Sequence, residues 1–183
     1  MKKILITVSG KDQPGIIAKV SGIFFARGCN LEDITMTLLE GQFAMMMTVC
    51  LPSKWASDSV LAALGFLEQL PWSLDCHVTS VKGKVQRGRK HRMGYLPHVI
   101  TAFGKDRTGI VYEVSRALAG LRINITDLDS RILGKGARTT YAMLLEVDVP
   151  GGSANRKLRD VLARTARKLK IEIQIKLLER VSF

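Results

Sequence analysis

The chain has 183 residues, of which 46% are hydrophobic and 24% charged, and its 28 lysines and arginines against 16 acidic residues give a net charge of +12. This composition excludes a chain that is disordered throughout. The three cysteines form no CxxC pair, which disfavours a disulfide scaffold or a cysteine-rich zinc site. No apolar run reaches the ~18 residues of a membrane span, and the N-terminal one is too short for a signal peptide. We expect a soluble, cytoplasmic protein without membrane contact.

The first half of the chain begins with a predicted strand and helix. Apolar alternation over residues 4–8 predicts the strand, which the sequence GKDQPG should end. Pro14 suits the first turn of the helix, because its missing N–H is not needed there, and Gly28 is expected at the C′ position that closes it. Helical spacing predicts one buried face, made by Ile16, Val20, Ile23 and Phe24.

The elements that follow complete the order βαββαβ. Two strands are predicted over residues 31–39 and 43–51, joined by a hairpin turn at 40–42. A second helix is predicted to start at residues 52–53, and a strand over 74–81 closes the unit. This helix is expected to bury Val60, Leu64 and Leu67.

The second half of the chain repeats the first. With an offset of 94 positions from Ile6, about twelve of 34 residues coincide, and residues 43–52 pair with 141–150 after an insertion of four. The same order is therefore predicted, with strands near 98–103, 124–133, 139–149 and 171–178 and helices over 109–120 and 154–169. The matching pairs include Gly10/Gly104, Asp12/Asp106, Gly15/Gly109, Asn30/Asn124 and Asp33/Asp127.

The predicted fold class is α+β, with two tandem ferredoxin-like units, each an antiparallel sheet with both helices on one face. We expect domains at residues 1–82 and 96–183, separated by a basic linker at 83–95. Residues 82–95 carry six basic residues and no acidic one, whereas 1–81 carry net −1 and 96–183 net +7. This segment and the basic helix could bind nucleic acid phosphates, but a solvated linker and a solvated helix face are favoured. No RNP-type or helix-turn-helix motif supports nucleic acid binding.

The chain resembles the ACT domain family in both repeats. D-x-P-G follows the first strand and N-[LI]-x-D follows the first helix. The form GKDQPGIIAKVSGIFFARGCNLEDI, followed by GQFAMMM, resembles more particularly the tandem ACT proteins similar to the glycine cleavage system transcriptional repressor and their single-ACT relatives. The resemblance implies a regulatory module that binds an amino acid between paired units. The positions it carries over are Asp12, Pro14, Gly15, Asn30, Asp106, Gly109 and Asn124.

Physical chemistry supports such a site independently. Free N–H groups at a helix N-terminus, around residues 15–17 or 109–111, favour a carboxylate, so Ile16, Thr108 and Ile110 join the candidate ligand-binding residues. Asp12 or Asp106 could accept a hydrogen bond from an ammonium group, and Asn30 or Asn124 could both donate and accept.

Each of these residues also has a purely structural interpretation. Asp12 and Asp106 could cap the helix or form an Asx turn, and Thr108 could act as an N-cap. Asn30 and Asn124 could adopt left-handed dihedrals after a helix. Gly10 and Gly104 are expected to serve the turn. Met45, Met46 and Met47 should alternate faces in a strand and serve packing.

No catalytic motif is found, and no metal or cofactor is expected. The leading hypothesis is a non-enzymatic amino-acid-sensing regulator that forms a homo-oligomer through ACT pairing. It would act on a transcription factor or metabolic partner, and the resemblance suggests glycine or serine as ligand. The alternatives are a nucleic-acid-associated protein that uses the basic linker and basic helix, and an assembly module without ligand.

Overall fold

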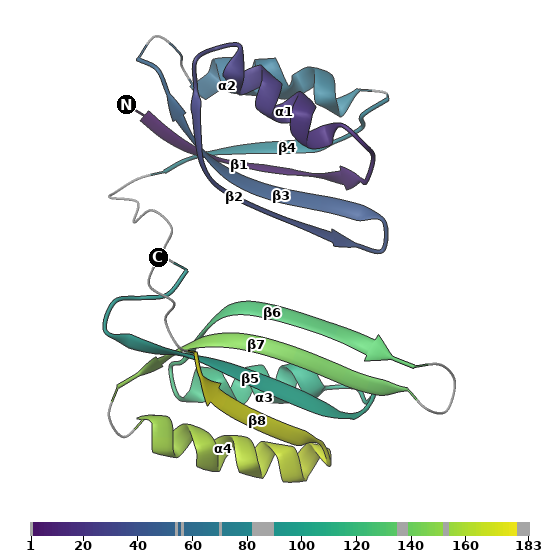
Figure 1. The fold of residues 1–183 in the computed structure, drawn as a ribbon, viewed down its shortest axis with the longest axis vertical. Helices are drawn as coiled ribbons and strands as arrows, with labels where there is room; N and C mark the ends of the chain where they lie inside the picture. Colours follow the sequence, from purple (N-terminus) through teal and green to yellow (C-terminus); the bar gives the residue numbers. More distant parts are fainter. Residues whose placement is uncertain are drawn as a thin grey trace. The chain divides into compact units, whose positions relative to one another are not determined.

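The computed structural model describes residues 2–53, 55, 57–69, 71–81, 90–134, 139–151 and 154–178. Most of the basic linker, residues 82–89, lies outside these ranges. The chain divides into two compact units, Met1–Gly88 and Arg89–Phe183, and both have the expected order βαββαβ (Figure 1).

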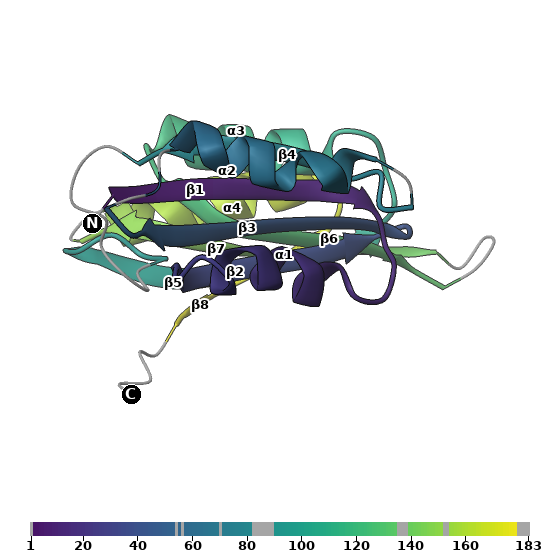
Figure 2. The same ribbon diagram turned by 90° about the horizontal axis from the view of Figure 1, so that it is seen from above.

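Unit 1 is a four-stranded antiparallel sheet with the strand order β2-β3-β1-β4. Both α-helices lie on one face of this sheet (Figure 1), with α1 over β2 and β3 and α2 over β1 and β4 (Figure 2). The elements are β1 (Lys2–Lys11), α1 (Ile16–Phe25), β2 (Asn30–Leu39), β3 (Gln42–Leu51), α2 (Ser57–Leu64), the 3-10 helix η1 (Gly65–Glu68) and β4 (Asp75–Ser80).

Unit 2 has the same topology, with the strand order β6-β7-β5-β8. The predicted ferredoxin-like arrangement is therefore confirmed in both halves. The elements are β5 (Tyr95–Lys105), α3 (Ile110–Gly120), β6 (Asn124–Leu133), β7 (Thr140–Pro150), α4 (Ala154–Leu169) and β8 (Glu172–Leu177).

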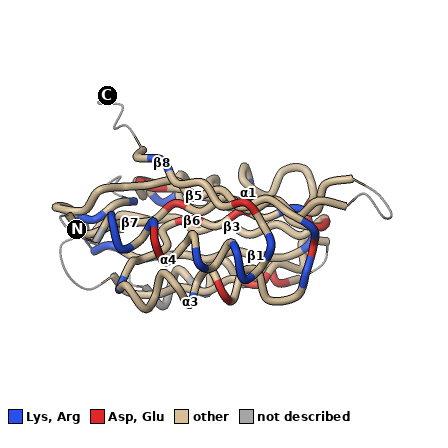
Figure 3. The backbone as a smooth tube through the Cα atoms, turned by 90° about the horizontal axis from the view of Figure 1, so that it is seen from below, with Lys and Arg blue, Asp and Glu red and all other residues tan. Residues whose placement is uncertain are grey.

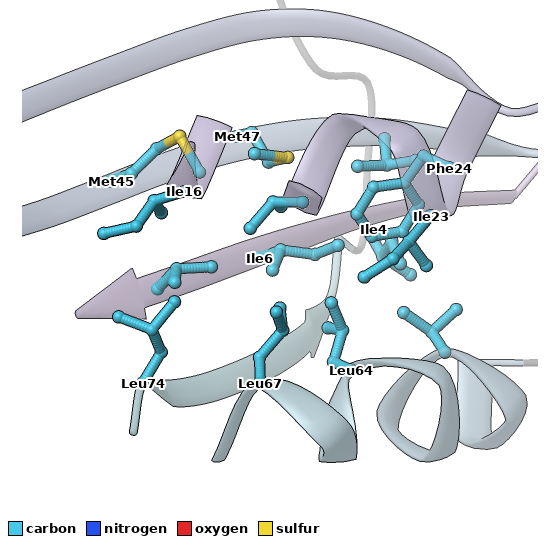
Figure 4. Packing of buried hydrophobic residues seen from close by; sticks show 14 of the residues in the cluster. Ile4, Ile6, Ile16, Ile23, Phe24, Met45, Met47, Leu64, Leu67 and Leu74 are labelled. Carbon is cyan, nitrogen blue, oxygen red and sulfur yellow. The ribbon is translucent and has the colours of Figure 1, made fainter. Parts of the chain in front are cut away.

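The core of unit 1 lies between the sheet and the helix layer (Figure 4). The predicted helix face is confirmed, because Ile16, Val20, Ile23 and Phe24 are all buried. Full burial of such side chains contributes about 1.5–3 kcal/mol each. The methionines alternate as expected: Met45 and Met47 are buried, while Met46 is 48% exposed on the other face.

Three predicted boundaries in unit 1 were wrong. Strand β1 does not stop before GKDQPG but continues to Lys11, because Gly10 and Lys11 still pair with Phe43 and Gln42 across the sheet. Pro14 lies before the first helical residue, Ile16, and not in the first turn.

The second helix also begins later than predicted. Instead of a helix from residue 52, Pro52 and Trp55 form a turn in which the Trp55 N–H donates to the Pro52 carbonyl at 3.0 Å. Helix α2 then starts at Ser57, and the buried Leu67 belongs to η1.

Gly10 and Gly104 serve close packing within the sheet and not a turn. A Cβ on Gly104 would lie 2.5 Å from Cγ2 and 3.1 Å from Cα of Ile171, and a Cβ on Gly10 would lie 2.8 Å from Cδ2 of Leu74. The segments that lead into β8 and β4 therefore approach these strands more closely than any side chain allows. This contact fixes where β5 and β1 leave the sheet for the loops that follow.

We predict that Gly104→Ala lowers the free energy of unfolding by about 1–3 kcal/mol, the usual cost of overpacking. Urea denaturation followed by circular dichroism measures this. Gly120→Ala is the matched control, because its Cβ meets nothing within 4 Å at the end of α3, and it should be neutral or stabilising. Equal effects of the two changes would contradict the packing explanation.

Candidate ligand-binding site

The loop between β1 and α1 presents an uncapped helix N-terminus. Gly15 is the N-cap residue, with a left-handed φ of 97°, and no side chain caps the helix. The Asp12 side chain is exposed, and the backbone N–H of Asp12 donates a hydrogen bond to the Gly41 carbonyl at 2.9 Å. The interpretation of Asp12 as a helix cap was therefore wrong.

The corresponding loop of unit 2 is built in the same way. Gly109 is the N-cap residue of α3 with a φ of 95°, again without a side-chain cap, so Thr108 does not act as the predicted N-cap. Asp106 is exposed. In both units the first N–H groups of the helix have no side-chain cap, which favours an anion there.

Asn30 and Asn124 do not lie beside these loops. Asn30 is the first residue of β2 and pairs with Cys50 of β3, which in turn pairs with Lys3 of β1. Lys3 is nine residues before Asp12. At ~3.3 Å per residue this separates them by roughly 30 Å. In unit 2, Asn124 pairs with Asp148, which pairs with Pro97. Pro97 is nine residues before Asp106, so Asn124 and Asp106 are separated in the same way. One unit alone therefore does not assemble the predicted set.

The interpretation of the two asparagines as left-handed residues was also wrong. The left-handed position after each helix is Gly28, with a φ of 67°, and Arg122, with a φ of 55°. The Cys29 N–H bonds to the Phe24 carbonyl and the Gly28 N–H to the Phe25 carbonyl, which is a Schellman motif and confirms the predicted C′ role of Gly28.

The loop of unit 1 is held by its own unit. The Gln13 Nε2 donates to the Trp72 carbonyl at 3.0 Å and lies 3.4 Å from the Pro71 carbonyl. The Trp72 ring lies 3.5 Å from the position of a Cβ on Gly15. The polar side chain nearest to the helix N-terminus is therefore already engaged.

The loop of unit 2 instead borders an open hollow of about 380 Å³, lined by residues 107–112 and by Tyr141. Arg107 stands where unit 1 has Gln13, and its side chain has no hydrogen bond or ion pair within the described residues. The Tyr141 hydroxyl is buried and has no hydrogen-bond partner there either. A buried hydroxyl without a partner costs free energy.

Arg107, Tyr112 and Tyr141 were missed in the sequence, although the repeat carried a signal for two of them. Alignment of the halves places Arg107 opposite Gln13 and Tyr141 opposite Phe43. Both differences add hydrogen-bonding capacity to unit 2 at the loop where the helix begins. A comparison of the two halves for differences, and not only for identities, would have singled out this loop.

Part of the segment predicted as a basic linker is bound to unit 2. The Lys90 Nζ lies 2.6 Å from a carboxylate oxygen of both Asp127 and Glu146. Asp148 is fully buried and accepts hydrogen bonds from the Arg92 backbone N–H at 2.9 Å and from the His91 Nδ1 at 2.8 Å. We call residues 90–92 the anchor segment.

The anchor segment is held electrostatically at neutral pH. The hydrogen bond from Lys90 lowers the pKa of the Asp127 carboxyl, and although burial opposes it, the contacts with Asp127 and Glu146 raise the pKa of Lys90. Both groups therefore stay charged. Because both of its partners are carboxylates of unit 2, Lys90 is less available to bind an external phosphate.

We predict that Asp148→Ala lowers the free energy of unfolding by about 1.5–3 kcal/mol, the contribution of a hydrogen bond to a charged group. Chemical denaturation measures this change. Asp129→Ala is the control, because Asp129 is exposed and lies 3.4 Å from Arg131 in a surface pair, for which the effect should stay below ~1 kcal/mol. If Asp148→Ala is as mild as the control, the anchor segment does not contribute to folding.

The cysteines and the metal-ligating side chains of the described residues form no metal site. The cysteines are free thiols, and burial, with Glu68 and Asp75 nearby, raises the pKa of Cys76 to about 11. Within the described ranges, no group of three or more His, Cys, Asp or Glu side chains could hold a metal ion. Among the described helices, none has the length and apolar character needed to cross a membrane.

Two tandem ferredoxin-like units with uncapped helix N-termini define the class of this chain. The sequence model of the ACT domain matches residues 2–78 and again 97–176. The chain therefore belongs to the ACT domain family and contains two copies of the domain.

Relatives and solved structures agree with this assignment. A UPF0237 protein of Neisseria meningitidis serogroup A is 37% identical over 78 residues, which are 42% of this chain and 82% of that protein. The structure of an unknown protein from Galdieria sulphuraria is similar with a TM-score of 0.81 and 22% identity, covering 97% of this chain and 99% of that one. A "putative glycine cleavage system transcriptional repressor" is similar with a TM-score of 0.66 and 15% identity, covering 98% of each chain. At sequence identities this low, the two similarities show that these proteins and this chain share a fold.

Proposed function

We propose that this protein is a non-enzymatic regulator that senses an amino acid through paired ACT units, with the 107–112 loop of unit 2 as its principal contact surface. The observation that carries the proposal is the hollow at this loop, where a helix N-terminus adjoins Tyr141 and Arg107, whose guanidinium has no partner within the described residues. ACT domains generally bind small amino-acid ligands, and the family assignment supports the same role here.

The groups at the loop match the two charged ends of an amino acid. Arg107 and the N–H groups of the first turn of α3 would receive the carboxylate. Asp106 would accept from the ammonium group, and the Tyr141 hydroxyl would complete its hydrogen bonding through the ligand. Glycine or serine is the proposed ligand, in line with the name of the repressor-like neighbour.

The distance between the loop and the asparagine supports a site shared between paired units. Strands β2 and β6 are the outermost strands on one side of their sheets. Antiparallel pairing of two such edges places the start of one strand beside the end of the other. Asn30 or Asn124 lies at the end of its sheet that is far from the loop of its own unit. In the paired arrangement this end would lie beside the loop of the partner unit.

Exposed apolar side chains on these edges support the pairing. On β2, Ile34, Met36 and Leu38 are each more than 40% exposed, and on β6 the same holds for Leu128 and Ile132. Rows of this kind on an edge strand favour association with a second sheet. A ligand bound at the shared surface would stabilise the paired state over the unpaired one. The proposed output is altered contact with a cytoplasmic transcription factor or metabolic partner.

A thermal-shift screen of the intact chain against the standard amino acids, followed by calorimetry, tests the proposal. At a ligand concentration of about 100 times the Kd, binding adds ~2.7 kcal/mol to stability, which corresponds to a rise of several degrees in Tm. Glycine or serine should produce this rise, because Arg107 and Asp106 match the two charged ends of the amino acid.

Variants locate the site. Arg107→Ala should abolish the shift, and Tyr141→Phe should weaken binding by about two- to tenfold, the contribution of one hydrogen bond. Arg156→Ala removes an equal charge from the exposed start of α4, away from the loop and from the pairing edges, and should leave binding unchanged. A Tm that no amino acid raises would overturn the sensor function, and a shift that survives Arg107→Ala would move the site to another surface.

A further inference from the structure

The helix layer of unit 2 contains a groove of about 370 Å³ between α3 and α4 that belongs to neither the loop hollow nor the core. Ala117 and Val161 line its apolar part. Four charged side chains surround them: Glu113 and Arg116 from α3, and Arg164 and Lys168 from α4.

The groove exists because unit 2 differs from unit 1 at this place. Alignment of the repeats puts Ala117 opposite Ile23, and Ile23 is a buried core residue that is only 7% exposed. The charge is also rearranged, since Glu113 and Arg116 stand opposite Lys19 and Gly22. A smaller side chain leaves room between the helices, and new charges border that room.

The charged border is organised by Glu113. Its carboxylate lies 2.8 Å from the Lys168 Nζ and 2.8 Å from an Arg116 guanidinium nitrogen, and the hydrogen bonds from Lys168 and then Arg116 lower the pKa of Glu113. It therefore stays ionised and holds two cations beside the groove. Arg164 is exposed and forms no ion pair within the described residues. Three cations against one carboxylate leave the border positive.

Further exposed lysines and arginines lie along α4 and directly after it, outside the groove; Figure 3 colours the lysines and arginines blue. They are Arg156, Lys157, Arg159 and Arg167 on α4 and Lys170 after its end.

We propose that this groove is a docking site for an acidic segment of a partner protein that inserts one apolar side chain between α3 and α4. The apolar part takes the side chain, and Arg116, Arg164 and Lys168 pair with flanking carboxylates. Charge complementarity with apolar anchoring is the usual basis of such recognition. The inference does not depend on amino-acid binding, because it concerns a different surface of unit 2.

An acidic peptide fits this surface better than a nucleic acid does. A nucleic acid offers phosphates but no aliphatic side chain for the apolar part, and the carboxylate of Glu113 would face its backbone. No aromatic side chain lines the groove for base stacking. The groove therefore favours a partner that carries both carboxylates and an apolar anchor.

Fluorescence anisotropy with a short labelled peptide, rich in glutamate and carrying one central leucine, tests the proposal on the full chain. Replacing the leucine by alanine in the peptide should weaken binding by about tenfold, since it removes the anchor while keeping all charges. This comparison leaves the protein unchanged, so its result does not depend on the folding of a variant.

Two protein variants then separate the groove from the general charge. Ala117→Ile restores the side chain of unit 1 and should weaken binding about tenfold by filling the apolar part, and Arg164→Glu should do the same by charge repulsion. Arg156→Glu makes an equal charge change elsewhere on α4 and should alter affinity by less than about twofold. Melting curves check that each variant is folded.

The proposal is overturned if the leucine-free peptide binds as tightly as the leucine peptide, or if Arg156→Glu and Arg164→Glu weaken binding equally. It is also overturned if a short DNA duplex displaces the peptide and binds more tightly, with no effect of Ala117→Ile on the duplex. Each of these results would make α4 a general polyanion surface.

Discussion

The antiparallel register of the central strands, β1 and β5, determines where every candidate group lies. Each central strand pairs with two neighbours along most of its length. The loop at its far end and the asparagine at its near end are therefore held at opposite ends of one rigid sheet. A side chain cannot reach across a distance of roughly 30 Å, so any site that uses both groups requires two units. Pairing of units would therefore be a condition for the proposed site.

Close packing keeps this register in place. At Gly104 the incoming chain of Ile171 occupies the space of a side chain, and on the opposite side of the sheet the buried Asp148 fixes the anchor segment. Neither contact involves the loops themselves. The loops are thus positioned by contacts that a ligand does not have to form, which lowers the entropic cost of binding.

The two repeats have kept one fold and have diverged at their surfaces. In unit 1, Gln13 and Trp72 close the loop against the chain, and Ile23 fills the helix layer. In unit 2, Arg107 and Tyr141 leave the loop open, and Ala117 opens a groove. Unit 2 therefore carries both proposed contact surfaces. The excess positive charge of its half of the sequence is concentrated on α4 and on the segment leading into β5.

The fold was predictable from the sequence because it rests on patterns that are local and repeated. Alternation in the strands, the helical spacing of Ile16, Val20 and Ile23, and the doubled motifs determine the topology. The position of Asn30 relative to Asp12 was not predictable, because adjacency in a motif says nothing about which end of a strand a residue occupies. The late start of α2 depends on a local turn at Pro52, and the role of Gly104 depends on Ile171, which is distant in sequence. The ion pairs of Lys90 were likewise not predictable, because their acidic partners lie on strands distant in the sequence.

A crystal structure of the full chain with glycine or serine bound tests the central claim most directly. We predict that the amino acid contacts the 107–112 loop and Tyr141 of one unit together with an asparagine carried by a different unit, either Asn30 or the Asn124 of a second copy. A ligand that contacts a single unit, or that lies away from this loop, would contradict the shared site.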